Sequence, residues 1–368
     1  MIYFDHNATT PIDERVVEAM LPYLKTFYGN PSSLYKMGRL VRSAIDTARE
    51  QVAALVDASP SQIIFTSGGT EANNLALNTL PVAAALAISA IEHPSITDPA
   101  KKWHQACYSL AVDSQGLIRP AAIDSLFQQT NKAALVSVML ANNETGVIQD
   151  IQAIADQLKT EQVISHTDAV QAIGKIPVSF AQLGVDLMSL SSHKIYGPKG
   201  CGALVVDKKV AISPQLLGGG QENGWRAGTE NVAAIVGFGK AAELALLELD
   251  SRAEDCLCLR QKLEQELKTI PNVFIFSEQV DRLPNTVQFG VKGIDGEMLL
   301  MQLDQKNIAV SSGSACASGG AKASDVLTAM GIDYQIAKSA IRVSLGKDNT
   351  EAEVKQFITV LKSFVTKE

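Results

Sequence analysis

The sequence predicts an α/β protein with two parts: a large one built on a mostly parallel, doubly wound sheet, and a smaller α+β one. Three observations predict this fold class. Short apolar runs alternate with helical patterns between residues 61 and 207, as in βα repeats. The chain has 368 residues, more than the usual limit of about 250 to 300 for one core. After the alternating region, short strands and a final helix follow in another order.

Six segments of the alternating region are short, apolar and bounded by turn residues, so we expect each to be a strand. They are QIIFTS (62–67), AALAISAI (84–91), AALVSVMLA (133–141), QVISHTDA (162–169), DLMSLSS (186–192) and GALVVD (202–207). Ligands of doubly wound sheets bind outside the carboxyl ends of the strands, so a functional site is expected there.

The other elements follow from spacing and composition. Residues 218–228 are rich in glycine and predict a loop, whereas residues 231–267 carry apolar residues at helical spacing and predict one long helix. NTVQFGV (285–291) predicts a strand, and a final helix is expected from Thr350 onward.

The change of pattern places a domain boundary within the long helix, near residue 250. We therefore expect a large domain at residues 15–250 and a small domain formed by residues 1–14 and 251–368. The Gly/Ser/Ala-rich segment 311–324 should be a mobile loop of the small domain.

Charge and composition exclude several classes of function. The net charge is -7, and lysine and arginine are scattered among acidic residues, so nucleic acid and anionic membranes are poor candidate partners. The first residues lack a basic start followed by an apolar core, and the longest apolar stretch, 82–91, is too short to span a bilayer. We expect a cytoplasmic protein.

The cysteines indicate neither a disulfide framework nor a zinc site, because their number is odd and paired CxxC spacing is missing. We predict no metal site. Four are expected to be buried as small apolar side chains, two near the sheet and two on the long helix. They are Cys107, Cys201, Cys256 and Cys258.

Lys194 is the most informative residue, because it follows an apolar strand within the glycine-rich turn SSHKIYGPKG. A lysine there can bind an aldehyde cofactor as a Schiff base and later act as a base near a substrate's Cα. Asp168, in HTDAVQ, ends the preceding strand and can face a pyridine nitrogen. Alone, Lys194 would be a solvated turn residue, but its pairing with Asp168 favours pyridoxal phosphate.

Other motifs are ambiguous in isolation. SGGTE (67–71) suits a phosphate at a helix start, or an ordinary helix cap by Thr70 with Asn73 nearby. His93, in EHPS, could lie flat on a cofactor ring or be a polar surface residue. The NNETG motif with Asn143 suits an amide at the ring oxygen, or a plain turn. Thr229, in RAGTE, could reach a phosphate of a neighbouring subunit or belong to a flexible loop.

Two further residues have a possible role toward a substrate. Arg342 alternates with apolar neighbours in a predicted strand and could bind a carboxylate in a bidentate manner, although a structural ion pair competes with this interpretation. Cys316 is the one cysteine in a segment expected to be exposed and mobile, as a reactive thiolate requires.

Together these motifs resemble those of the cysteine desulfurases of the NifS and IscS type, which are fold-type I pyridoxal phosphate enzymes of the class V aminotransferase kind. The resemblance runs from YFDHNATTP near the start to the last strand. It is carried by SGGTEANN, EHPS, NNETG, HTDAVQ, SSHKIYGPKG, RAGTEN, SSGSACAS and AIRVSLG.

The resemblance implies removal of sulfur from L-cysteine by a homodimer, with sulfur passing to an acceptor such as an iron-sulfur scaffold protein. Lys194 would bind the cofactor, Cys316 would accept the sulfur and His93 would stack on the ring. The other residues implied as cofactor ligands are Gly69, Thr70, Asn143, Asp168, Gln171, Ser191, His193 and, from the other subunit, Thr229. The residues implied to meet the substrate are Arg342, Asn143 and Asn7.

Two departures from the family pattern leave the acceptor open. Ala321-Lys322-Ala323 stands where relatives often have Leu-Glu-Pro, and the sequence ends at Glu368 without a longer docking tail. Alternatives are a selenocysteine lyase, another aminotransferase-like enzyme, or a sulfur carrier that lacks the cofactor. A transaminase needs no acceptor thiol, so Cys316 favours the desulfurase.

Overall fold

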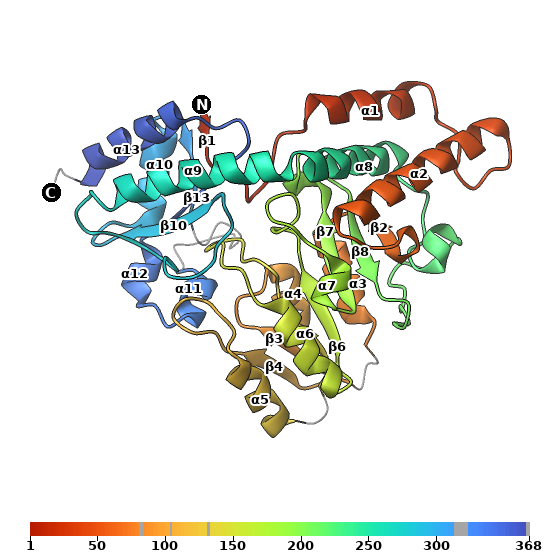
Figure 1. The fold of residues 1–368 in the computed structure, drawn as a ribbon, viewed down its shortest axis with the longest axis horizontal. Helices are drawn as coiled ribbons and strands as arrows, with labels where there is room; N and C mark the ends of the chain where they lie inside the picture. The colour runs from red at the N-terminus through yellow and green to blue at the C-terminus, as the bar shows by residue number, and fades with distance from the viewer. Residues whose placement is uncertain (81–83, 104, 131–132, 313–322, 366–368) are drawn as a thin grey trace.

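The computed structural model describes residues 1–80, 84–103, 105–130, 133–312 and 323–365. Within them, a seven-stranded sheet of order β2-β8-β7-β6-β5-β3-β4 forms the centre of the larger part (Figure 1). Only β8 runs antiparallel to its neighbours, so the predicted mostly parallel sheet is confirmed. The strands are β2 (Ile63–Thr66), β3 (Ala85–Ser89), β4 (Cys107–Leu110), β5 (Ala133–Ser137), β6 (Ile164–Asp168), β7 (Leu187–Ser191) and β8 (Gly202–Val206).

All six strands expected from the sequence are present, and β4 is an additional one. β4 lies at the edge of the sheet, where it pairs only with β3. Of its four residues only Leu110 is buried, so no apolar run marks the strand in the sequence. The inner strands are buried on both faces and therefore consist of the continuous apolar runs that predicted them.

Helices cover both faces of this sheet, because alternate strand residues belong to two separate cores. Phe65 belongs to a core that includes residues of α2, α5, α6, α7 and α8, while its neighbour Ile64 belongs to a second core that includes residues of α3 and α4. In Figure 1, α1 and α2 lie beside α8. The helices are α1 (Glu14–Lys25), α2 (Lys36–Leu55), α3 (Gly69–Asn78), α4 (Pro94–Lys101), α5 (Pro120–Gln129), α6 (Ile151–Thr160), α7 (Phe180–Leu183) and α8 (Val232–Leu247).

The prediction of one long helix over 231–267 is wrong in one respect. The segment forms two helices, α8 and α9 (Leu249–Leu267), which lie nearly end to end (Figure 1). Glu248 between them has φ -107° and ψ 12° and so leaves the helical conformation. Its carboxylate accepts hydrogen bonds from Arg15 and Arg252, which hold the interruption in place.

A second, antiparallel sheet of order β12-β13-β10-β9 packs with α9, α10 and α13 around its own core. The predicted strand in 285–291 and the final helix are confirmed as β10 and α13. The remaining elements are β9 (Val273–Ile275), β10 (Thr286–Val291), α10 (Gly296–Asp304), β12 (Ser311–Ser312), α11 (Asp325–Ala329), α12 (Tyr334–Lys338), β13 (Ala340–Ser344) and α13 (Glu351–Val365).

The N-terminal residues join the second part and then cross to the first. β1 (Ile2–Tyr3) pairs in parallel with β11 (Ile308–Ala309), and Asp5 bridges to Ser344. Thr10 then donates its main-chain N–H to the carbonyl of His193, at 3.0 Å. This crossing places residues 7–10 over the carboxyl end of β7. The expected domain boundaries themselves stay a prediction.

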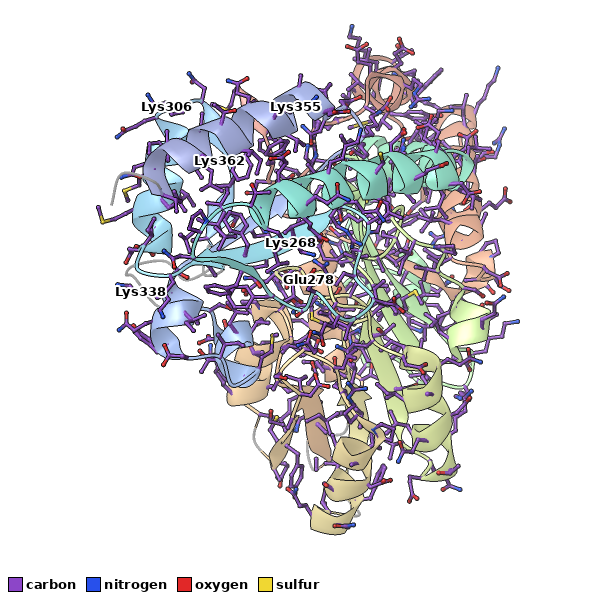
Figure 2. The ribbon with its side chains drawn as sticks, turned by 60° about the vertical axis from the view of Figure 1, so that its left-hand side comes forward. Lys268, Glu278, Lys306, Lys338, Lys355 and Lys362 are labelled. Atoms are coloured by element: carbon purple, nitrogen blue, oxygen red, sulfur yellow. The ribbon has the colours of Figure 1, made fainter. Side chains whose placement is uncertain are left out.

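Several lysines of the second part form ion pairs with carboxylates. Figure 2 labels several of its lysines, and Lys338 pairs with Asp295 while Lys362 pairs with Glu266. The labelled residues Lys268 and Glu278 also form an ion pair. Across the described part of the chain, none of the helices has the length and apolar character needed to cross a membrane.

Candidate active site

The carboxyl ends of β6 and β7 bring Lys194 and Asp168 to the same edge of the large sheet. The two strands are parallel neighbours, with Asp168 opposite Ser189. Three residues after β7, Lys194 ends a short 3₁₀ turn, and its Nζ donates to the carbonyl oxygens of Asn7 at 2.5 Å and Ala8 at 2.7 Å. The crossing N-terminal segment therefore covers the lysine.

Asp168 is buried and held by two donors. Its Oδ1 accepts from the main-chain N–H of Val170 at 2.9 Å, and its Oδ2 accepts from Nδ2 of Asn73 at 2.7 Å. A buried carboxylate at a strand end, held in one orientation, suits a pyridinium nitrogen. The sequence indicated Asn73 only as part of a helix cap, so its contact with Asp168 was missed.

The start of α3 fits a phosphate group. Gly68 provides no side-chain cap, so the first N–H groups of the helix have no capping side chain and favour an anion. A Cβ on Gly69 would lie 3.0 Å from Cγ2 of Val170 and 3.5 Å from Cβ of Ser191, so glycine permits the close approach to β7. The buried Oγ of Ser191 has no hydrogen-bond partner among the described residues. This is expected of a hydroxyl that binds a ligand.

His193 and His93 flank this edge as neutral rings. Burial, with Lys194 and Lys199 as further causes, lowers the pKa of His193 to about 4, and its Nδ1 lies 3.1 Å from Oγ1 of Thr9. Burial also lowers the pKa of His93, which caps the N-terminus of α4.

Gln171 is oriented by a lysine that the sequence analysis missed. Nζ of Lys175 donates to Oε1 of Gln171 at 2.8 Å and to Oδ1 of Asn7 at 2.9 Å, while Nε2 of Gln171 donates to the carbonyl of Asn7 at 2.9 Å. Burial, reinforced by Lys194 and Arg342, places the pKa of Lys175 well below its ordinary value. The signal in the sequence was its position only four residues after Gln171, within the same turn.

The side chain of Asn7 is fully engaged by the protein. Its Nδ2 donates to Oγ1 of Thr286 at 2.9 Å and to the carbonyl of Asn143 at 3.2 Å, and its Oδ1 also accepts from Asn285. Asn7 thus joins the two parts of the molecule beside Lys194. A contact between Asn7 and a substrate stays a prediction.

Arg342 lies on β13 next to these residues. Its Nη1 donates to the carbonyl of Asn143 at 2.9 Å and its Nη2 to Oδ1 of Asp5 at 2.6 Å, so the ion pair considered as an alternative is present. Its buried Nε has no partner among the described residues. These bonds use two of the five N–H donors of the guanidinium, so donors remain for another acceptor.

Glu144 lies near Arg342 and contacts Ser324, the second residue after the undescribed segment 313–322. Burial raises its pKa to about 7, and its Oε2 accepts from Oγ of Ser324 at 2.6 Å. Cys316 lies outside the described residues.

Two of the four other cysteines contradict the expected burial. Cys107 is exposed because β4 is an edge strand, and Cys258 is exposed because it lies two residues, and so more than half a helical turn, from the buried Cys256 on α9. Burial raises the pKa of Cys256 to about 11 and that of Cys201 to about 12.

Thr229 and Lys194 line different hollows of the structure. Thr229 is exposed and lines a hollow of about 180 Å³ together with Ser67 and Gly200. The remaining predicted residues lie at the carboxyl edge of the sheet or on the adjacent faces of the N-terminal segment and β13.

Known proteins match nearly the whole chain. A family model described as aminotransferase class-V matches residues 2–357. A cysteine desulfurase of Nostoc sp. is 43% identical, over 99% of this chain and 93% of its own length, and the cysteine desulfurase IscS of Dictyoglomus turgidum is 42% identical, over 100% and 95%. A solved structure of a NifS-like protein from Rickettsia africae has a TM-score of 0.92 at 39% identity and covers 99% of each chain. The chain therefore belongs to the class-V aminotransferase family.

Proposed function

We propose that the protein is a cysteine desulfurase that uses pyridoxal phosphate to take sulfur from L-cysteine. The observation that carries this proposal is the meeting of Lys194 and Asp168 at the ends of two adjacent parallel strands, beside the uncapped start of α3. The relatives named cysteine desulfurase, similar over almost their full length, support the choice of substrate.

The residues at this edge fit the cofactor by charge and donor type. Lys194 would bind it covalently, Asp168 would face its ring nitrogen, and Gln171 would present Nε2 to its ring oxygen. The first N–H groups of α3, the hydroxyl of Ser191 and the ring of His193 would hold its phosphate. When bound, the cofactor supplies an electron sink for the bonds broken at the substrate's Cα and Cβ.

The chain's own residues would supply the remaining steps. Lys194 would take the proton from the substrate Cα and return it during turnover. Arg342 would bind the substrate carboxylate, with Asn143 beside it. The thiolate of Cys316 would attack the substrate sulfur: an S–S bond forms, the C–S bond breaks, its electron pair stays with the carbon skeleton, and protonation gives alanine.

Partners and location are part of the proposal. We infer a homodimer in which Thr229 serves the phosphate of the other subunit, since the hollow that Thr229 lines in its own chain does not include Lys194. The persulfide on Cys316 would pass its sulfur to an acceptor such as an iron-sulfur scaffold protein. A cytoplasmic location remains a prediction from the sequence.

Borohydride reduction of the purified holoenzyme, followed by peptide mapping, tests the proposed site. The reduced cofactor should be found on the peptide containing Lys194, and the protein should convert cysteine to alanine and sulfide. Lys199→Ala, in the same turn, is the matched control and should still be labelled on Lys194. Label on another lysine would reject the proposed site, and absence of cysteine turnover would reject the activity.

A further inference from the structure

Hydrogen bonds join four polar side chains in a row, which are Asp168, Asn73, Ser95 and His93. Asn73 lies on α3, Ser95 lies in the first turn of α4, and His93 caps α4. Nδ2 of Asn73 lies 2.7 Å from Oδ2 of Asp168 and 2.8 Å from Oγ of Ser95, and that Oγ lies 2.8 Å from Nδ1 of His93. Asn73, Ser95 and Asp168 are all buried, so water does not compete for these contacts.

The chemistry of each group fixes the direction of these hydrogen bonds. An ionised carboxylate only accepts, so Asn73 must present its NH₂ group to Asp168. The second hydrogen of that group goes to Oγ of Ser95. A hydroxyl has two acceptor sites and one hydrogen, so Ser95 can accept this bond and still donate its hydrogen to Nδ1 of His93.

A second donor reaches the same nitrogen. The main-chain N–H of Ser95 points at Nδ1 of His93 at 3.1 Å, as part of the helix cap. A nitrogen that accepts two hydrogen bonds cannot carry a proton, so the network assigns the ring proton to Nε2. Burial, opposed by the nearby Asp168 and supported by Lys194, lowers the pKa of His93, which agrees with a neutral ring.

We propose that Asn73 and Ser95 are positioning residues that hold His93 in its neutral Nε2–H tautomer. His93 then meets the cofactor and substrate as a stacking ring and a hydrogen-bond donor, and it does not accept a proton during turnover. Proton transfer at the substrate Cα is left to Lys194. The consequence for turnover rests on the proposed function, whereas the tautomer is a property of the protein's own contacts.

NMR of the holoenzyme labelled with ¹⁵N-histidine measures the tautomer directly, with His93→Gln used to assign the signals. The unmodified protein should show His93 as neutral Nε2–H at pH 7. An Nδ1–H tautomer or a charged ring would overturn the proposal without the need for any further variant.

Two variants test whether the network is the cause. Ser95→Ala removes one of the two donors to Nδ1, and Asn73→Ala frees the Ser95 hydroxyl to turn and accept, so both should populate the Nδ1–H tautomer and raise the pKa of His93. Ser95→Thr retains a hydroxyl and should restore the original tautomer. Asn74→Ala is the matched control, because Nδ2 of Asn74 contacts only the main-chain oxygens of Thr70 and Ser95. A tautomer unchanged in both test variants would overturn the proposal.

The pH profile of turnover provides a readout that a purely structural role would not move. In Ser95→Ala, kcat for cysteine should fall about threefold to tenfold, as expected for one lost hydrogen bond, and the acidic limb should shift to higher pH. A profile that scales down without shifting would contradict the role in turnover. If the tautomer is as proposed but cysteine is not a substrate, the proposed function fails and the tautomer assignment stands.

Discussion

Nζ of Lys175 donates a hydrogen bond to Oε1 of Gln171 at 2.8 Å, four residues earlier in the chain, and so fixes the position of that amide oxygen. The same Nζ binds Oδ1 of Asn7. Lys175, which is partly exposed, thus contacts two neutral amides, and burial of its amine, with Lys194 as a further cause, lowers its pKa. We predict that this contact orients Gln171 toward the cofactor.

Lys175→Met should weaken cofactor affinity on the order of tenfold, because the freed amide of Gln171 can rotate and its Oε1 loses a buried donor. Titration of the cofactor-free protein, followed by cofactor absorbance, measures this. Lys208→Met, at an exposed site after β8, controls for the loss of one positive charge. Equal affinity in the parent and Lys175→Met would show that Gln171 needs no such partner.

Arg342→Ala should raise KM for cysteine on the order of a hundredfold, since loss of a bidentate charged contact costs about 2 to 4 kcal/mol. Steady-state kinetics and cofactor spectra separate substrate binding from cofactor binding. Asp5→Asn breaks the ion pair but keeps the guanidinium, so its effect on KM should be much smaller. A lower Tm in Arg342→Ala with unchanged KM would mean that the pair with Asp5 is the whole role of Arg342.

Glu92 should make stability depend on pH. Burial, with Asp168 as an additional cause, raises its pKa from an ordinary 4.5 to about 8. The folded state then binds the proton more tightly than the unfolded state, so the contribution is complete below pH 4.5 and is lost as the pH rises toward 8. Denaturant unfolding across this window should therefore show the free energy of unfolding of Glu92→Gln rising relative to that of the parent.

Glutamine is a close mimic of the protonated carboxyl, because Oε1 can still accept from Ser89 and from the N–H of Met139. Glu254→Gln, at an exposed position on α9, controls for the removal of one charge. Parallel stability curves for Glu92→Gln and the parent between pH 4.5 and 8 would contradict a buried, protonated Glu92.

Mixing a Thr229→Ala chain with a Lys194→Ala chain should restore activity, because a shared site requires Thr229 from one subunit and Lys194 from the other. In a mixed dimer one site carries both defects and the second carries neither. Turnover of cysteine by the exchanged mixture is the measurement, with each parent alone as the control. If subunits exchange and no activity returns, Thr229 serves its own chain.

The sequence predicted the parts of the site that are local in the chain. Lys194 and Asp168 follow apolar runs, and their meeting follows from parallel neighbouring strands. The contacts between Asn73 and Asp168, between Lys175 and Asn7, and between Arg342 and Asp5 join residues from 95 to 337 positions apart. No periodicity encodes such pairs, because they depend on how the two parts of the chain pack.

The predicted helices and strands differ from the observed ones for related reasons. β4 was missed because an edge strand buries little apolar surface, and the break at Glu248 was missed because glutamate is a good helix former whose partners, Arg15 and Arg252, only the fold brings together. The exposure of Cys258 depends on which face of α9 packs against the core. Apolar and polar residues are only weakly separated onto two faces of α9, although Cys256 and Leu263 are buried.

The mass of the peptide containing Cys316, after the enzyme has reacted with cysteine without a reductant, tests the central claim most directly. That peptide should gain the mass of one sulfur atom, and Cys316→Ala should bind the cofactor but release neither alanine nor sulfide from cysteine at a useful rate. Cys107 and Cys258 are exposed thiols and serve as internal controls, which should stay unmodified. Sulfur found on Cys107 or Cys258 in place of Cys316, or normal cysteine turnover by Cys316→Ala, would contradict the account.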